Sequence, residues 1–173
     1  MASESEIRPE LRIEPAEPAD APAIAAVIEA NRADPSIFLR SERDVRRRIE
    51  EFEVAIDPGG RVVGCAALHG WPGRLGELLS VAVEPARQGA GVGRRLVEAC
   101  LRRGDERGLD RVWLATAKPG YFERFGFSPT PWWRLPPRVL VAKLGAVARQ
   151  PPGRIAGALL GRFVFMERRR AGA

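Results

Sequence analysis

The sequence predicts one α/β domain in which helices pack on a β-sheet. Segments with helical periodicity and segments with strand periodicity are interspersed along the chain, with two helices before three strands and alternating elements after them. The composition agrees, since 45% hydrophobic and 29% charged residues among 173 are typical of a globular domain with one buried core.

Two amphipathic helices are predicted near the N-terminus, after a weak strand at residues 11–15. The first begins near Asp20, and its apolar face consists of Ile24, Val27 and Ile28. The second is expected over residues 41–52, where Ser41 can cap the first turn.

After the second helix the spacing of the apolar residues changes from a helical period to the period of a β-strand. Residues 53–57 and 61–70 form a predicted hairpin, because they flank the turn sequence Asp-Pro-Gly-Gly. Residues 75–83 are a nearly continuous apolar run, which indicates a central strand buried on both faces. One charged side chain, Glu77, interrupts this run.

A glycine-rich loop leads from this strand into a third helix. The apolar stripe of the helix consists of Val92, Leu96, Val97, Cys100 and Leu101. A strand is expected over residues 109–117, a short helix over 118–125 and the start of a further strand at 126–130. The predicted order is therefore β, α, α, β, β, β, α, β, α, β.

The periodicity of the apolar residues becomes less regular after residue 130. We therefore divide the chain there into a core (residues 1–130) and a basic appendage (residues 131–173). Two helical faces are predicted in the appendage: Leu140, Leu144 and Val147 on one, and Leu159, Leu160, Phe163 and Val164 on the other. We expect the appendage to dock on the core or on a second subunit of a homodimer.

Composition argues against several classes of protein. No stretch approaches the roughly 18 apolar residues of a membrane-spanning helix, and the first residues lack a secretory signal, so we expect a cytoplasmic protein. Cys65 and Cys100 lack CxxC spacing and are expected to be reduced packing residues, with no metal site. The net charge of +6 is concentrated in the appendage and does not by itself indicate nucleic-acid binding, which we consider an unlikely partner.

The loop from Gln88 to Arg94 has the properties of a diphosphate cradle. Its glycines let the backbone approach a ligand closely, and the amides of the following helix N-terminus carry partial positive charge. Such a loop also occurs as a plain helix start. A Walker loop is excluded because Arg94 follows Gly93 where lysine is required, and a Rossmann loop is disfavoured because Asp110 precedes its strand.

The run VAVEPARQGAGVGRRLVEACL resembles the acetyl-CoA signature of the GNAT superfamily, in which Gln88, Gly91 and Gly93 occupy the fixed places. The later YFERFGF resembles the same family's aromatic-rich helix and Gly-Phe turn. The resemblance extends from about residue 7 to residue 130. It implies a GNAT fold: a mixed, mostly antiparallel twisted sheet whose fourth and fifth strands splay apart.

The resemblance also implies acetyl-CoA as a co-substrate, without a metal. Pantetheine would bond to the main chain at Val81, Ala82 and Val83. The diphosphate would lie on the amides of Gln88, Gly89, Ala90, Gly91, Val92, Gly93 and Arg94. The acetyl group would pass directly to a neutral amine, without a covalent enzyme intermediate.

Two residues are candidates for proton transfer. Glu77 matches a strand position that holds a glutamate base in some members of the family; the alternative is a structural ion pair. The tyrosine that often protonates the departing thiolate is replaced by Phe122. Tyr121 is adjacent and could take its place, or it could be an aromatic wall while water protonates the thiolate.

The strand and aromatic motifs are similar to those of amino-acid acetylating enzymes, including acetylglutamate synthases. This similarity implies a small, amino-acid-like amine as acceptor, with Arg43, Arg46 or Arg47 as a carboxylate ligand. Two alternatives remain open. One is acetylation of protein lysines or N-termini in an open groove, and the other is a non-catalytic acyl-CoA-binding module with a basic interaction tail.

Overall fold

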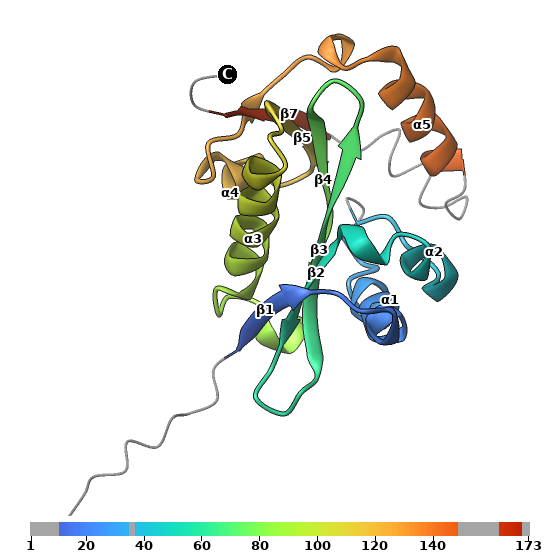
Figure 1. The fold of residues 1–173 in the computed structure, drawn as a ribbon, viewed down its shortest axis with the longest axis vertical. Helices are drawn as coiled ribbons and strands as arrows, with labels where there is room; N and C mark the ends of the chain where they lie inside the picture. The colour runs from blue at the N-terminus through green and yellow to red at the C-terminus, as the bar shows by residue number, and fades with distance from the viewer. Residues whose placement is uncertain (1–10, 35–36, 149–162, 171–173) are drawn as a thin grey trace, which may run out of the picture.

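A central sheet of seven strands organises the computed structural model, which describes residues 11–34, 37–148 and 163–170. The strand order is β1-β2-β3-β4-β5-β7-β6 (Figure 1). The strands span Arg12–Pro15 (β1), Phe52–Ile56 (β2), Val62–Trp71 (β3), Leu75–Val83 (β4), Arg111–Thr116 (β5), Ser128–Pro129 (β6) and Val164–Arg169 (β7). Among these neighbours β4 and β5 are parallel and the other pairs are antiparallel, so the expected mixed sheet is confirmed.

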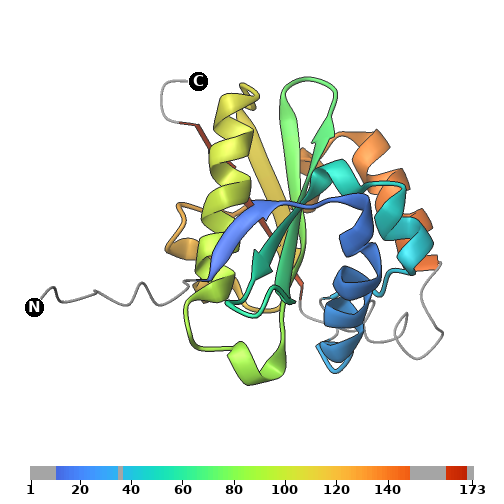
Figure 2. The same cartoon turned by 60° about the horizontal axis from the view of Figure 1, so that its bottom comes forward.

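Helices cover both faces of the sheet (Figures 1 and 2). One face carries α1 (Ala21–Ala30), α2 (Glu42–Arg46) and α5 (Pro137–Ala148), and the other carries α3 (Val92–Glu106) and α4 (Pro119–Glu123). In the described part of the chain, no helix combines the length and hydropathy needed to cross a bilayer.

The alternation of side chains along each strand builds separate apolar clusters on the two faces. Val112 and Leu114 of β5 pack in the cluster under α3, whereas Trp113 between them packs with Leu75 and Val139 in the cluster under α5. The predicted stripes of α1 and α3 are buried. The two cysteines are buried as well.

The expected separation of the central strands is confirmed by their pairing. β4 pairs with β5 only over Leu75–Glu77, whereas β5 remains paired with β7 along its whole length. Beyond this point β4 bends: Ser80 has a positive φ of 54°, opposite a register shift in β3. A bulge of this kind redirects a strand and often lies next to a functional site.

The second predicted helix is shorter than expected. Ser41 caps it, since its Oγ accepts from the Asp44 amide at 3.2 Å, but the helix ends at Arg46. Phe52 is the last residue of the predicted helix over residues 41–52. In the structure it instead begins β2, opposite Ala67 of β3. Strand pairing prevails because it buries the Phe52 ring in the cluster under α1.

Among its described residues, the C-terminal segment contains one of the two predicted helices. α5 confirms the first, but the prediction of a second was wrong for Val164, which belongs to β7, and Leu159 and Leu160 lie outside the described residues. β7 pairs with both β5 and β6. The strand is favoured because it satisfies the edge of β5, buries Met166 and stacks Phe165 on Trp113 at 6.1 Å.

Candidate functional site

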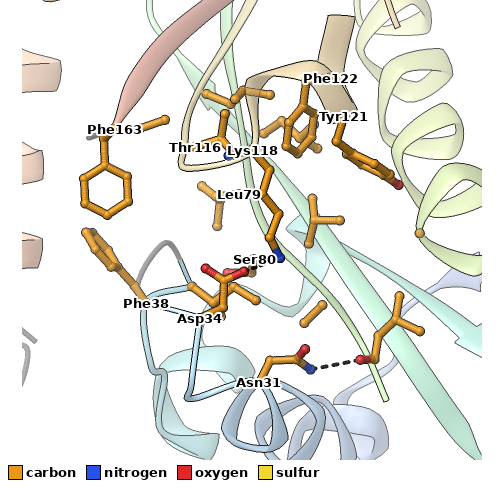
Figure 3. A pocket seen from close by; sticks show the side chains of 18 of the residues that line it. Asn31, Asp34, Phe38, Leu79, Ser80, Thr116, Lys118, Tyr121, Phe122 and Phe163 are labelled. Carbon is orange, nitrogen blue, oxygen red and sulfur yellow. Dashed lines mark hydrogen bonds and ion pairs between the residues drawn. The ribbon is translucent and has the colours of Figure 1, made fainter. Parts of the chain in front are cut away.

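A cavity of about 640 Å³ lies where β4 and β5 diverge (Figure 3). Its walls come from the end of α1 and the segment after it, from Leu78–Val83 of β4, from the glycine-rich loop, from the end of β5, and from α4, α5 and the start of β7. The divergence leaves the side of β4 that faces β5 without a strand partner over these residues. The site is therefore a slot between two strands, one wall of which is a stretch of β4 that is not paired with β5.

The glycine-rich loop reaches this cavity in the conformation that the sequence indicates. Gly89 and Gly91 have φ values of 81° and 80°, and Gly91 is the N-cap residue of α3. Residues 88–91 are exposed, and the first amides of a helix have no partner within it. The loop thus presents amides and a helix N-terminus beside the slot, an arrangement suited to an anion.

Most of the predicted cofactor residues line the cavity: Val81, Ala82, Val83, Gln88, Gly89, Gly91, Gly93 and Arg94. Ala90 and Val92 do not. Val92 is turned into the cluster under α3, where it is 4% exposed. Its side chain therefore serves packing, and only its amide is placed at the helix start.

Arg40 is a cavity residue that the sequence analysis did not single out. Its Nε donates to Ser80 Oγ on the bend of β4 at 2.8 Å. Burial, followed by repulsion from Arg48, lowers the pKa of the Arg40 guanidinium, which is still charged at neutral pH. Among the described residues, Arg40 has no carboxylate within ion-pair distance.

The arginines that were considered as carboxylate ligands lie elsewhere. Arg43, Arg46 and Arg47 are exposed and do not line the cavity, and Arg46 pairs with Glu42 at 2.7 Å on the surface of α2. Arg40 follows an irregular segment with no periodicity. Its place in the cavity depends on its contact with Ser80, which is 40 residues away in the sequence.

Glu77 is buried behind the cavity wall and is not among the lining residues. It accepts a hydrogen bond from Trp71 Nε1 at 3.1 Å and forms an ion pair with Lys143 of α5. The Lys143 ammonium also lies over the Trp113 ring, 5.1 Å from its centroid, and Lys143 does line the cavity. The Glu77 carboxylate is therefore connected to the slot through the side chain of Lys143.

Tyr121 and Phe122 both line the cavity, with their rings in an edge-to-face contact at 5.0 Å. The Tyr121 hydroxyl lies at the start of α3, 2.9 Å from where a Cβ on Gly93 would stand. In Figure 3 the Tyr121 ring turns away from Thr116 and Lys118. Burial raises the pKa of Tyr121, so the hydroxyl keeps its proton at neutral pH.

Comparison with known proteins gives a consistent result. Residues 23–127 match the family described as Acetyltransferase (GNAT) family. An amino-acid acetyltransferase of Mycobacterium tuberculosis is 35% identical over 111 residues, which are 63% of this chain and 63% of that protein. An uncharacterized N-acetyltransferase of Chlorobaculum tepidum is 34% identical over 109 residues, 63% of this chain and 70% of that one. This chain thus spans less than two thirds of the mycobacterial relative.

Two solved structures share the fold of this chain. A Mycobacterium tuberculosis protein, crystallised with CoA and a second ligand, superposes with a TM-score of 0.77 at 27% identity and covers 92% of this chain and 99% of its own. An N-acetylglutamate synthase of Neisseria gonorrhoeae superposes with a TM-score of 0.69 at 23% identity, covering 92% of this chain and 35% of its own. The second likeness is one of fold alone.

Proposed function

Because this chain belongs to the acetyltransferase (GNAT) family, we propose that it transfers an acetyl group from acetyl-CoA to a small primary amine that carries a carboxylate. The observation that carries the acceptor class is Arg40, a half-buried guanidinium that lines the cavity without a carboxylate partner among the described residues. A buried charge is costly unless it is paired. An acceptor carboxylate would supply the missing partner.

The cofactor part of the proposal rests on the slot and its loop. The pantetheine arm would lie between β4 and β5, along Val81–Val83, with the diphosphate on the loop amides from Gln88 to Arg94. Arg94 pairs with Glu98 at 2.8 Å on the surface of α3, so its charge is partly engaged. A mycobacterial protein of the same fold was crystallised with CoA, which supports binding of acetyl-CoA by this chain.

The acceptor class agrees with the relatives' names. Amino-acid acetyltransferase is the name of the 35% identical mycobacterial relative, and amino acids combine a primary amine with a carboxylate. The guanidinium fork of arginine matches a carboxylate in a bidentate geometry. Ser80 fixes the Nε end of Arg40 and orients the remaining N–H groups.

The reaction we propose is direct transfer. The neutral amine attacks the thioester carbonyl, the new C–N bond forms, and the C–S bond breaks to release the coenzyme A thiolate. Glu77 accepts the ammonium proton through water, since its carboxylate does not line the cavity. Tyr121 returns a proton to the thiolate.

The test is a thiol-release assay with acetyl-CoA and pairs of amines, each an amino acid matched with its decarboxylated counterpart. We expect release of coenzyme A and formation of the N-acetyl product with the amino acids, and about 10²-fold weaker kcat/KM without the carboxylate. Faster reaction with peptides would indicate a protein acetyltransferase. Binding of acetyl-CoA without release by any amine would indicate a non-catalytic module.

Replacement of Tyr121 by phenylalanine is expected to lower kcat about tenfold, because water can in part replace the hydroxyl as a proton donor. The raised pKa of Tyr121 also predicts that the wild-type rate keeps this donor until the pH exceeds the ordinary tyrosine value of about 10. kcat should be measured across pH at saturating substrates. An unchanged kcat would make Tyr121 an aromatic wall.

A further inference from the structure

A cluster of two side-chain amides, buried at Asn31 and partly buried where Gln88 meets it, joins the end of α1 to the glycine-rich loop. Asn31, the C-cap residue of α1, is 9% exposed. Its Nδ2 donates to the carbonyl oxygens of Val27 at 2.9 Å and Val83 at 3.0 Å. Figure 3 shows the Asn31 side chain at the wall of the cavity. Gln88 Nε2 donates to Asn31 Oδ1 at 2.9 Å and to the Val83 carbonyl at 3.1 Å. All four amide hydrogens of the two side chains are used.

This set of contacts fixes which way the Asn31 amide points. The reverse orientation would place its oxygen against the Val27 and Val83 carbonyls and its nitrogen against the Gln88 donor. A polar network whose N–H donors are all paired, and which is buried at its centre on Asn31, rigidifies the segments that it joins. Asn31 therefore holds the end of α1, the end of β4 and the first residue of the loop in one arrangement.

The loop after this anchor consists largely of residues with wide conformational freedom. Gly89 and Gly91 both have positive φ, and glycine loses more entropy than other residues when it is ordered. A ligand that must order such a loop loses affinity, and an anchor that orders the loop beforehand removes part of this cost. Gln88 is the attachment point, and its partners are Asn31 and the Val83 carbonyl.

We infer that Asn31 is a positioning residue for coenzyme A. It acts through Gln88, which it holds so that the amides from Gly89 to Gly93 face the diphosphate. This inference rests on the proposed use of acetyl-CoA. It assigns to the C-cap residue of α1 a role that neither the loop motif nor the helix pattern indicates.

The test is calorimetric titration of the full chain with coenzyme A. Asn31→Ala is expected to raise the Kd about tenfold, because it removes the partner of Gln88 and leaves the Val27 carbonyl without its donor. Gln88→Ala should have a similar effect. The double variant should be weakened by much less than the product of the two, since both residues act in one network. In steady-state assays KM for acetyl-CoA should rise while kcat changes little.

A matched control separates positioning from loss of stability. Ile24→Val also affects α1, where Ile24 is buried in the apolar cluster, but it touches no part of the amide network. We expect this control to lower Tm and to leave the Kd for coenzyme A unchanged. An unchanged Kd in Asn31→Ala, or an equal weakening in Ile24→Val, would overturn the inference. Absence of binding to the wild-type chain would instead refute the proposed function.

Discussion

Replacement of Glu77 by glutamine is expected to lower kcat about 10³-fold while KM for acetyl-CoA stays nearly constant, if the carboxylate accepts the proton of the acceptor amine. Glutamine keeps the size of the side chain and can still accept the hydrogen bond from Trp71 Nε1. It removes the proton acceptor and leaves the cofactor loop untouched. The measurement is kcat at saturating substrates over a range of pH.

The contrasting explanation is that Glu77 serves only to hold Lys143 and, through it, α5. Lys143→Met separates the two, because it removes the ion pair and keeps the carboxylate. If Glu77 is the base, Lys143→Met should lower Tm but reduce kcat far less than Glu77→Gln does. The loss of kcat in Glu77→Gln should become smaller at a pH where the free amine of the acceptor predominates. Equal losses of Tm with little loss of kcat in both variants would leave Glu77 a structural ion pair.

The parts of the fold that the sequence predicts are those with a strong local signal. β4 has the predicted bounds, 75–83, because a buried central strand is continuously apolar, and the stripe of α3 follows from its period. The glycine-rich loop between them is equally local. Gly89 and Gly91 occur where φ is positive, so this part of its conformation could be expected from residue type alone.

The parts that it does not predict depend on contacts between distant segments. Val164 fits a predicted helical face together with Leu159, Leu160 and Phe163, and only pairing with the edge of β5 shows that it begins a strand. Arg40 and Asn31 likewise stand in segments without a motif. Their importance comes from partners on β4, Ser80 and Val83, that are 40 and 52 residues away.

Replacement of Arg40 by glutamine is expected to reduce kcat/KM for an amino-acid acceptor about 10²-fold, the effect of losing a charge-assisted bidentate contact of about 3 kcal/mol. The matched amine without a carboxylate should change less than about threefold, because it makes no such contact. Arg40→Lys should fall between, since it keeps the charge and loses the fork. Equal losses for both acceptors would show that Arg40 does not recognise the carboxylate.

Stability supplies an independent test of the same idea. In the free protein Arg40 is a half-buried cation without an ion-pair partner among the described residues, so its removal should leave Tm unchanged or raise it. The acceptor should then raise Tm of the wild-type chain and not that of Arg40→Gln. A residue present only for packing would behave in the opposite way, because its loss would lower Tm and leave the shift with acceptor intact. The free energy spent on burying an unpaired guanidinium is thus recovered when a carboxylate binds.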